Sequence, residues 1–594
     1  MSQDEFEFDQ IVIGSGFGGA CSALRLSEKG YKVLVIEKGR RWQDDDFPST
    51  NWNLGKFLWV PVLKLFGTWQ VTLTRKVIVL HGAGVGGGSL IYANTHLIPT
   101  DEVFQSECWS RVRPDWKTTL SPFYSLAQRM LGVTYNQYEN AVDHTLRKVA
   151  QRMGREQTYR LVNSGVLLPQ EGRGGDTVAD PYFNGDGPER ITCRYCGACM
   201  IGCPHNAKNT LTKNYLYFAE RNGVEIRPES KVVRIEPLPN AQGIKDGSAG
   251  YELTVVKSEA WFFKQSYKIR TRGVVLSGGV IGTVPLLLQS KYLDKTLPGL
   301  SERLGHQVRT NSETFMSVSF KNPKPAGQDE IWEGTSITSI FSPDDETNIE
   351  PCRFPKGSDS MWLVGLPVPL TENSGEGRWP RPVQLLFNIL RHPIKSLGLM
   401  QPFGKAKKTV FLMVMQSKES FVHMELDRRW YHLFLRHWSI VQKANDVPLT
   451  TYFPVGQQAS RLYAEESGGE VGNAVADIVA GTPATAHIMG GVAIGKDVAC
   501  GVVDGTGAVF GYQNLRVLDG SIIPGNLGVN PSLTILALSE YAMSQIPIWD
   551  QAKSSQIKPI LFSKPLNGQV SALTGEGNLL NEVNRLNSLK GGSS

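Results

Sequence analysis

The sequence contains no long uninterrupted apolar run, and it has little excess charge of either sign. Hydrophobic residues make up 41% and charged residues 20% of the 594 positions, and the formal net charge is +6. Gly, Ser, Asn or Pro interrupts each of the longest stretches without Lys, Arg, Asp or Glu, which are residues 77–100, 273–290 and 520–539. We therefore expect no membrane-spanning helix. A charge so nearly balanced over this length also argues against a nucleic-acid-binding protein.

The N-terminal residues do not have the pattern of a secretory leader. Residues 1–7 read MSQDEFE and are acidic, whereas a leader begins basic and continues apolar. We therefore expect a cytoplasmic protein. The length exceeds what one hydrophobic core usually serves, so it predicts several subdomains or one large α/β enzyme.

The first forty residues contain the pattern strand, turn, helix, strand. An apolar run at 10–16 meets glycines, apolar residues recur at helical spacing over 20–29, and a second apolar run covers 31–37. This pattern predicts a βαβ unit with G-x-G-x-x-G at its first turn and an acidic residue at the end of its second strand. The combination is typical of dinucleotide binding, and a glycine turn without a nucleotide is the alternative.

Each of the three glycines of this motif, and the acidic residue, has its own physical role. Gly14 permits the tight turn, Gly16 lets the backbone approach a pyrophosphate, and Gly19 lets the helix pack on the strand. Glu37 is placed to accept a hydrogen bond from a ribose hydroxyl. A second glycine-rich turn at 82–89 favours a larger cofactor that lies flat against the main chain, with a flexible loop as the alternative.

Two later segments are expected to return to the same sheet. Residues 274–282 read as a strand that ends in small residues, and 514–519 read as a strand followed by Gly-Ser. With the motif HIMGG at 487–491 and GVNP at 528–531, the whole set resembles the glucose–methanol–choline (GMC) flavin oxidoreductases, and within them the cholesterol oxidase branch. Local likeness to that branch lies at residues 53–59, 89–94 and 207–211.

The resemblance implies a fold, a cofactor and a set of contacts. The fold is α/β, with a Rossmann-like, doubly wound FAD-binding domain and an inserted α+β substrate-binding domain. We predict non-covalently bound FAD, although His81 and His96 leave a covalent link open. The predicted cofactor-binding residues are Gly14, Gly16, Phe17, Gly18, Gly19, Glu37, Gly84, Gly88, Ser89, Asn94, Val233, Gly278, Asp519, Gly520 and Asn530.

Oxidation of an alcohol by a flavin requires polar groups that face the ring in an otherwise apolar cavity. The resemblance places His487 and Asn530 there as catalytic residues. A structural histidine beside glycines, and an asparagine that caps a turn or helix, are the alternatives. Glu350 is a third candidate, as a catalytic base, and a solvated loop carboxylate is its alternative.

Four of the eight cysteines lie within eleven residues, in the spacing C-x2-C-x2-C-x3-C-P. This spacing is that of a bacterial ferredoxin run, so an iron–sulfur cluster is one interpretation. Structural thiols, zinc and disulfides are the others. A cluster would favour electron delivery to a quinone or protein acceptor. The candidate metal ligands are Cys193, Cys196, Cys199 and Cys203.

Positive charge is concentrated in residues 381–438, which contain ten Lys or Arg and three Asp or Glu. Apolar runs alternate with these charges, as on surfaces that rest on anionic lipid. An amphipathic core element with a solvated basic face is the alternative. Residues 56–69 form an apolar loop that the resemblance places near the substrate entrance. We expect a lipophilic substrate and peripheral contact with a membrane at its inner face.

The predicted domains follow from these segments. The FAD-binding domain comprises 1–100, 190–300 and 480–550, the connecting region is 101–189, the substrate-binding domain is 301–479, and 551–594 is a C-terminal tail. The predicted activity is oxidation of an alcohol of a sterol, steroid or long-chain type. A fatty-acid photodecarboxylase and a catalytically silent lipid-binding flavoprotein are the other functions considered.

Overall fold

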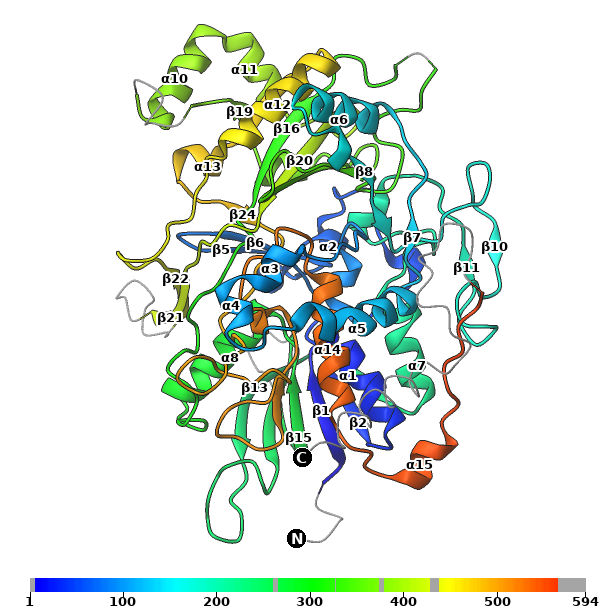
Figure 1. Cartoon of the computed structure of the whole chain (residues 1–594), viewed down its shortest axis with the longest axis vertical. Coiled ribbons are helices and arrows are strands. Elements are labelled where there is room, and N and C mark those ends of the chain that lie inside the picture. The colour runs from blue at the N-terminus through cyan, green and yellow to red at the C-terminus, as the bar shows by residue number, and fades with distance from the viewer. Residues whose placement is uncertain (1–5, 260–264, 326, 373–378, 428–436, 565–594) are drawn as a thin grey trace.

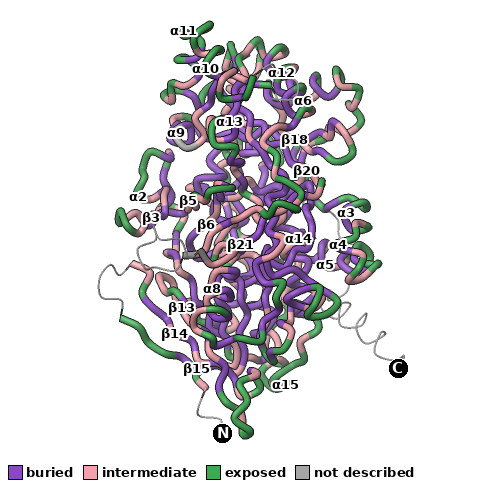
Figure 2. The backbone as a smooth tube through the Cα atoms, turned by 90° about the vertical axis from the view of Figure 1, so that its left-hand side faces the viewer, coloured by how far each residue is buried: buried purple, intermediate pink, exposed green. Residues whose placement is uncertain are grey.

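The computed structural model describes residues 6–259, 265–325, 327–372, 379–427 and 437–564. Two main β-sheets lie toward opposite ends of the molecule, at the bottom and the top of Figure 1. Purple, buried backbone runs continuously between them in Figure 2. None of the described helices is both long enough and apolar enough to cross a membrane.

The lower sheet combines strands from distant parts of the chain in the order β12-β2-β1-β15-β14-β13, with β25 paired to β15. The central strands are parallel, whereas β13 and β14 are antiparallel to their neighbours. The predicted βαβ unit and both predicted returns to its sheet are confirmed. The strands of the lower sheet are β1 (Phe8–Ile13), β2 (Val33–Ile36), β12 (Glu225–Arg227), β13 (Ser230–Pro237), β14 (Tyr251–Lys257), β15 (Ser266–Leu276) and β25 (Leu515–Val517).

A buried ion pair holds together two helices, each of which begins next to a residue that the sequence singles out. Helix α1 (Phe17–Glu28) starts directly after Gly16, and α14 (Ser532–Ser544) starts two residues after Asn530. Arg25 donates to both carboxylate oxygens of Glu540, at 2.7 and 2.8 Å. The pair fixes α1 against α14, and it therefore fixes the first glycine turn relative to the loop that carries Asn530.

The upper sheet has the antiparallel order β18-β20-β16-β23-β19. Helix α12 (Pro454–Ser467) packs on one face of it, and α6 (Ala141–Arg152) packs on α12. Because side chains alternate along a strand, the other face is free to line a cavity. Its strands are β16 (Thr314–Ser319), β18 (Thr347–Cys352), β19 (Pro367–Pro369), β20 (Thr409–Gln416) and β23 (Glu470–Ala474).

A smaller sheet, with the order β24-β6-β5, lies between the two large ones in Figure 1. Its strands are β5 (Trp69–Leu73), β6 (Ile78–Gly82) and β24 (Ala484–Thr485). The remaining helices are α2 (Leu54–Phe57), α3 (Asp101–Gln105), α4 (Glu107–Ser110), α5 (Trp116–Met130), α7 (Tyr215–Arg221), α8 (Val280–Tyr292), α9 (Met361–Val364), α10 (Arg381–Arg391), α11 (Pro393–Met400), α13 (Val475–Val479) and α15 (Gln551–Gln556).

The strands of the lower sheet come from the segments predicted for the FAD-binding domain, and those of the upper sheet from 301–479. The predicted domain limits themselves stay a prediction. Within the predicted tail, 551–556 form helix α15, and 565–594 lie outside the described residues.

Candidate active site

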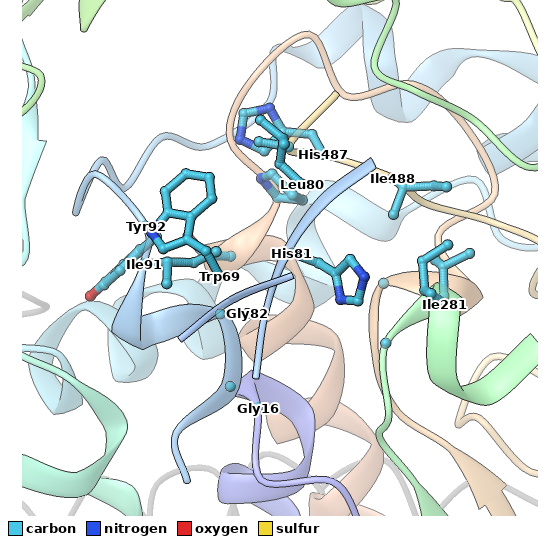
Figure 3. Close-up of a pocket in the computed structure, with 18 of the residues that line it drawn as sticks. Gly16, Trp69, Leu80, His81, Gly82, Ile91, Tyr92, Ile281, His487 and Ile488 are labelled. Carbon is cyan, nitrogen blue, oxygen red and sulfur yellow. The ribbon is translucent and has the colours of Figure 1, made fainter. Parts of the chain in front are cut away.

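A cavity of about 390 Å³ lies between the two large sheets. One wall is formed by the turns at the carboxyl ends of β1 and β15, and the opposite wall by the inner face of β16 and β20. Figure 3 shows Gly16 and Gly82 at one end of it and His487 at the other. Such a place, at the carboxyl ends of parallel strands, is where doubly wound sheets bind ligands.

The first glycine turn has the space that a dinucleotide needs. A Cβ atom added at Gly16 would meet no atom of the chain within 4 Å, and Gly16 lines the cavity. A Cβ at Gly14 would lie 2.3 Å from the carbonyl oxygen of Ser277, and one at Gly19 would lie 2.0 Å from that of Gly14. Gly14 and Gly19 thus allow close packing, while Gly16 leaves room for a pyrophosphate, as FAD requires.

Two buried carboxylates hold the glycine-rich loops. Glu37 accepts hydrogen bonds from the backbone and side chain of Ser15 (3.0 and 2.8 Å) and from the amide of Gly39. Asp519 accepts from the amide of Gly279 (2.9 Å), so it joins the β25 end to the start of α8. Burial raises the pKa of Asp519, while its hydrogen bonds act in the opposite direction.

The cavity brings together most, but not all, of the residues that the sequence singles out. Those that line it are Gly14, Gly16, Phe17, Gly18, Glu37, Gly88, Gly278, His487, Asp519, Gly520 and Asn530. Those that do not line it are Gly19, Gly84, Ser89, Asn94, Val233 and Glu350. Val232, the neighbour of Val233, does line the cavity, and the strand register shifts between Val232 and Arg234.

His487 follows the short strand β24, which pairs with β6 and so delivers the ring to the cavity. Its Nδ1 lies 3.2 Å from Oε2 of Glu313, an ion-pair distance without hydrogen-bond geometry. Glu313 is completely buried and also accepts from Thr485 Oγ1 (2.9 Å) and the amide of Ala486. Burial alone would lower the pKa of His487, but the carboxylates of Glu313 and Glu350 outweigh it and raise the pKa.

Asn530 and Glu350 form a second polar pair. Asn530 donates from Nδ2 to Oε2 of Glu350 at 3.3 Å, and its buried Oδ1 has no partner among the described residues. Glu350 is fully buried on β18, so the alternative of a solvated loop carboxylate is wrong. Burial raises the pKa of Glu350 to about 7, although Asn530 and His487 lower it in part. Asn530 does not cap α14, because the N-cap residue is Pro531.

The rest of this part of the cavity is largely apolar because of strand alternation. On β16 and β20, Phe315, Phe411 and Met413 face the cavity, while Met316 and Leu412 face the core under α12. Few polar groups interrupt this surface, so a polar group of a ligand has few places to bind.

Sequence reasoning missed two carboxyl groups at this site, Glu313 and Asp477. Asp477 lines the cavity from α13, and burial raises its pKa to about 7. It accepts a hydrogen bond from Thr314 Oγ1 at 2.7 Å. Neither residue belongs to a recognisable motif, because its position depends on which strands become neighbours in the fold.

The histidines that left the mode of FAD attachment open differ in position. His81 lines the cavity, and its Nε2 lies 2.9 Å from Thr72 Oγ1. Burial, with Lys38 nearby, holds the pKa of His81 well below its usual value. His96 is buried outside the cavity lining, and burial lowers its pKa to about 3.

The four clustered cysteines line a separate cavity of only about 10 Å³. All are free thiols. Throughout the residues that the structure describes, no group of three or more His, Cys, Asp or Glu side chains is arranged to hold a metal ion. Burial raises the pKa of Cys193, Cys196 and Cys199, to about 12 for Cys196. A cavity of this size does not fit an iron–sulfur cluster, whose iron and sulfide atoms need more space between the thiols.

The cysteine segment instead supports the wall of the large cavity. Buried Lys208 donates from Nζ to the carbonyl oxygens of Cys199 (2.7 Å), Leu90 (3.0 Å) and Tyr92 (2.9 Å). Tyr92 lines the large cavity. The lysine therefore ties the thiol segment to the second glycine-rich loop.

Comparison with known proteins agrees with this architecture. The profile of the GMC oxidoreductase family matches residues 186–308 and 423–539, and that of an NAD(P)-binding Rossmann-like domain matches 12–42. A cholesterol oxidase of Acinetobacter baumannii is 42% identical over 549 residues, which cover 92% of this chain and 96% of that protein. A cholesterol oxidase of Mycobacterium tuberculosis is 39% identical, with 91% of each chain covered.

More distant relatives share the fold. A long-chain-alcohol oxidase of Arabidopsis thaliana is 25% identical over 91% of this chain and 67% of its own. The crystal structure of pyridoxine 4-oxidase from Mesorbium loti superposes with a TM-score of 0.56 at 17% identity, covering 90% of this chain and 98% of that one.

The fold and the dinucleotide cradle define an FAD-dependent oxidoreductase that acts on CH–OH groups. The chain belongs to the GMC oxidoreductase family, closely related to cholesterol oxidases and more distantly to long-chain-alcohol oxidases. The predicted α/β fold class is thereby confirmed.

Proposed function

We propose that this protein oxidises the hydroxyl group of a bulky lipophilic alcohol, of a sterol, steroid or long-chain type, to a carbonyl group. The observation that carries the proposal is that His487 and Asn530 line one cavity, whose adjoining wall is largely apolar. Such a cavity binds an apolar body and leaves one place for a hydroxyl group. The names of the related cholesterol oxidases support the same substrate class.

FAD would be held by the turns at Gly16, Gly88 and Gly278, with Glu37 and Asp519 fixing these loops. When bound, FAD supplies the acceptor for the hydride that leaves the carbinol carbon. Loss of the hydroxyl proton must accompany loss of the hydride, so that the C–O single bond becomes C=O. The proton therefore needs a base within reach of the substrate oxygen.

His487 is the base in this proposal. Because Nδ1 faces Glu313, Nε2 is the ring nitrogen available to the substrate oxygen. The carboxylate of Glu313 stabilises the imidazolium that forms when His487 takes the proton. Nδ2 of Asn530 donates one hydrogen to Glu350, which fixes the orientation of the amide. Through its second hydrogen, Nδ2 donates to the substrate oxygen and holds it while His487 takes the hydroxyl proton.

Molecular oxygen is the electron acceptor that we favour over a quinone or protein acceptor. The cysteine cavity supports this choice, because a cavity of about 10 Å³ does not fit an iron–sulfur cluster. The relatives' names as oxidases point the same way. A photodecarboxylase or a silent lipid-binding protein would have no use for a base and an oriented amide at one hydroxyl site.

The test is substrate oxidation by the purified holoenzyme under air and under nitrogen. With a 3β-hydroxysterol and with a long-chain alcohol, we expect flavin bleaching without oxygen, and hydrogen peroxide with oxygen. Failure of every bulky alcohol to bleach the flavin would overturn the proposed substrate class. Bleaching without peroxide, together with reduction of a one-electron dye, would overturn only the proposed acceptor.

A further inference from the structure

Helices α10 and α11 expose large apolar side chains on their outer side. These side chains are between 56% and 85% exposed, although each would gain by leaving water. The two helices project at one end of the molecule, at the upper left of Figure 1, and include residues coloured as exposed in Figure 2. We call this surface the α10–α11 face, and its residues are Leu386, Phe387, Leu390, Ile394, Leu397 and Phe403.

The exposed side chains are not needed to hold the helices on the protein. Leu385 and Leu399 are buried on the opposite side of these helices, where Leu385 packs with Val368 and Ile478. Arg381 adds hydrogen bonds to Thr371 and Thr451. The helices are thus anchored by one side, and a second apolar side remains in water, which marks an interaction surface.

The charges on the segment that forms the face have one sign, and the side chain of Glu470 on β23 lies next to them, with Oε1 3.8 Å from Nζ of Lys395. Residues 379–408 contain six Lys or Arg and no Asp or Glu. Among them, Arg391, Lys395, Lys407 and Lys408 are exposed. An apolar helical side flanked by basic side chains has the chemistry of a helix that lies in the interface of an anionic bilayer. The predicted basic stretch 381–438 also includes 428–436, which lie outside the described residues.

The face adjoins the wall of the active-site cavity. Helix α10 packs on α13, and Ala476 and Asp477 of α13 line the cavity. Phe403 also stacks on exposed Trp52, with ring centroids 5.8 Å apart. Only the α10 layer therefore separates a partner bound at the α10–α11 face from the part of the cavity wall that α13 forms.

We propose that the α10–α11 face docks on an anionic phospholipid bilayer, with its six apolar side chains in the boundary between headgroups and acyl chains. The inference rests on the proposed function for its purpose, since a lipophilic alcohol resides in such a bilayer. Binding itself requires no catalysis, so the two proposals can fail separately.

The experiment is sedimentation of the flavin-loaded full chain with vesicles of phosphatidylcholine alone and of phosphatidylcholine mixed with phosphatidylglycerol. We expect co-sedimentation with the anionic vesicles, weakened by salt. The double variant F387E/I394E should lower the vesicle partition coefficient at least about tenfold, because two inserted apolar side chains become charged. A matched control, Ile244→Glu, places the same charge at an exposed apolar position outside this face and should leave binding unchanged.

Each outcome decides the proposal. Equal binding of the wild type and F387E/I394E, or no binding to anionic vesicles, overturns it. Sedimentation velocity tests a different occupant of the face. If the wild type is a dimer, and the variant is a monomer whose vesicle binding is unchanged, the face binds a second copy of this chain instead. Docking is supported if the variant oxidises an alcohol delivered in cyclodextrin as fast as the wild type does, but oxidises the same alcohol in vesicles more slowly. Absence of any alcohol oxidation with vesicle binding intact defeats only the proposed function.

Discussion

Oε2 of buried Glu313 lies 3.2 Å from Nδ1 of His487, whose ring lines the cavity. Because the carboxylate of Glu313 lies at Nδ1 of His487, Nε2 is the nitrogen that faces the substrate. The carboxylate also favours the protonated ring, because the negative charge is buried where water screens it little. The pair thus connects the position of β16 in the upper sheet to the chemistry of the loop after β24.

Glu313→Gln should move the acid limb of the pH profile of kcat/KM to lower pH. A base must be neutral to accept a proton, so activity rises with pH through the pKa of His487. Glu313 raises that pKa, and removal of its charge lowers it. The measurement is kcat/KM against pH with flavin content checked at each point. An acid limb that does not move, in a variant with normal flavin content, would contradict the role of Glu313.

His487→Ala should lower kcat by about 10²- to 10⁴-fold while FAD stays bound, which is the usual contribution of a general base. Asn530→Ala should reduce kcat less, because Asn530 orients the hydroxyl group and does not take its proton. Stopped-flow reduction of the flavin under nitrogen measures both effects. Wild-type rates in both variants would refute the assignment of this pair to alcohol oxidation.

Gly16→Val should abolish flavin binding without unfolding the chain. A Cβ atom at this position meets no protein atom within 4 Å, and the valine side chain would occupy the space assigned to the pyrophosphate. The visible absorption of the purified protein reports flavin, and far-ultraviolet circular dichroism reports the fold. As a control, the new Cβ in Gly55→Val would make only an ordinary van der Waals contact, at 3.8 Å from Asn53 Oδ1, and Gly55 lies outside the cavity lining. Normal flavin content in Gly16→Val would disprove the placement.

Glu350→Gln should make stability less dependent on pH. Burial raises the folded-state pKa of Glu350 from 4.5 to about 7. A carboxyl whose pKa is raised on folding loses stability as pH rises through the interval from about 4.5 to about 7, by on the order of 3 kcal/mol. The neutral amide has no such loss, so the melting temperature of the variant relative to wild type should increase over this interval. A constant difference would contradict the buried, protonated carboxyl group.

The cysteine segment should contain no iron. Protein expressed with ample iron and purified without oxygen should show iron and sulfide at background level, because the cavity that the thiols line is only about 10 Å³. Cys196→Ser should retain FAD and turnover. Three or four irons per chain with matching sulfide would show that the thiols rearrange around a cluster and would restore the ferredoxin-like interpretation.

The sequence by itself determined the dinucleotide-binding unit and the family. The G-x-G-x-x-G turn, Glu37 and the two returning strands are local patterns whose spacing follows from strand and helix geometry, and the structure confirms them. His487 and Asn530 could be named because the short motifs that contain them resemble those of the GMC family. Their presence in one cavity agrees with that prediction, while their catalytic roles stay a proposal.

Only the tertiary structure decided the partners of these residues. Glu313 comes within reach of His487 because β16 and β24 become neighbours, although the two residues are 174 positions apart in the chain. Strand alternation on β18 points Ile349 toward α12 and α6 and points Glu350 to the other face of the sheet, where its carboxyl group is buried. The cysteine spacing resembled a ferredoxin ligand run, yet the fold gives these thiols a small, apolar cavity. Sequence spacing determines local geometry, whereas burial and charge depend on which distant segments pack together.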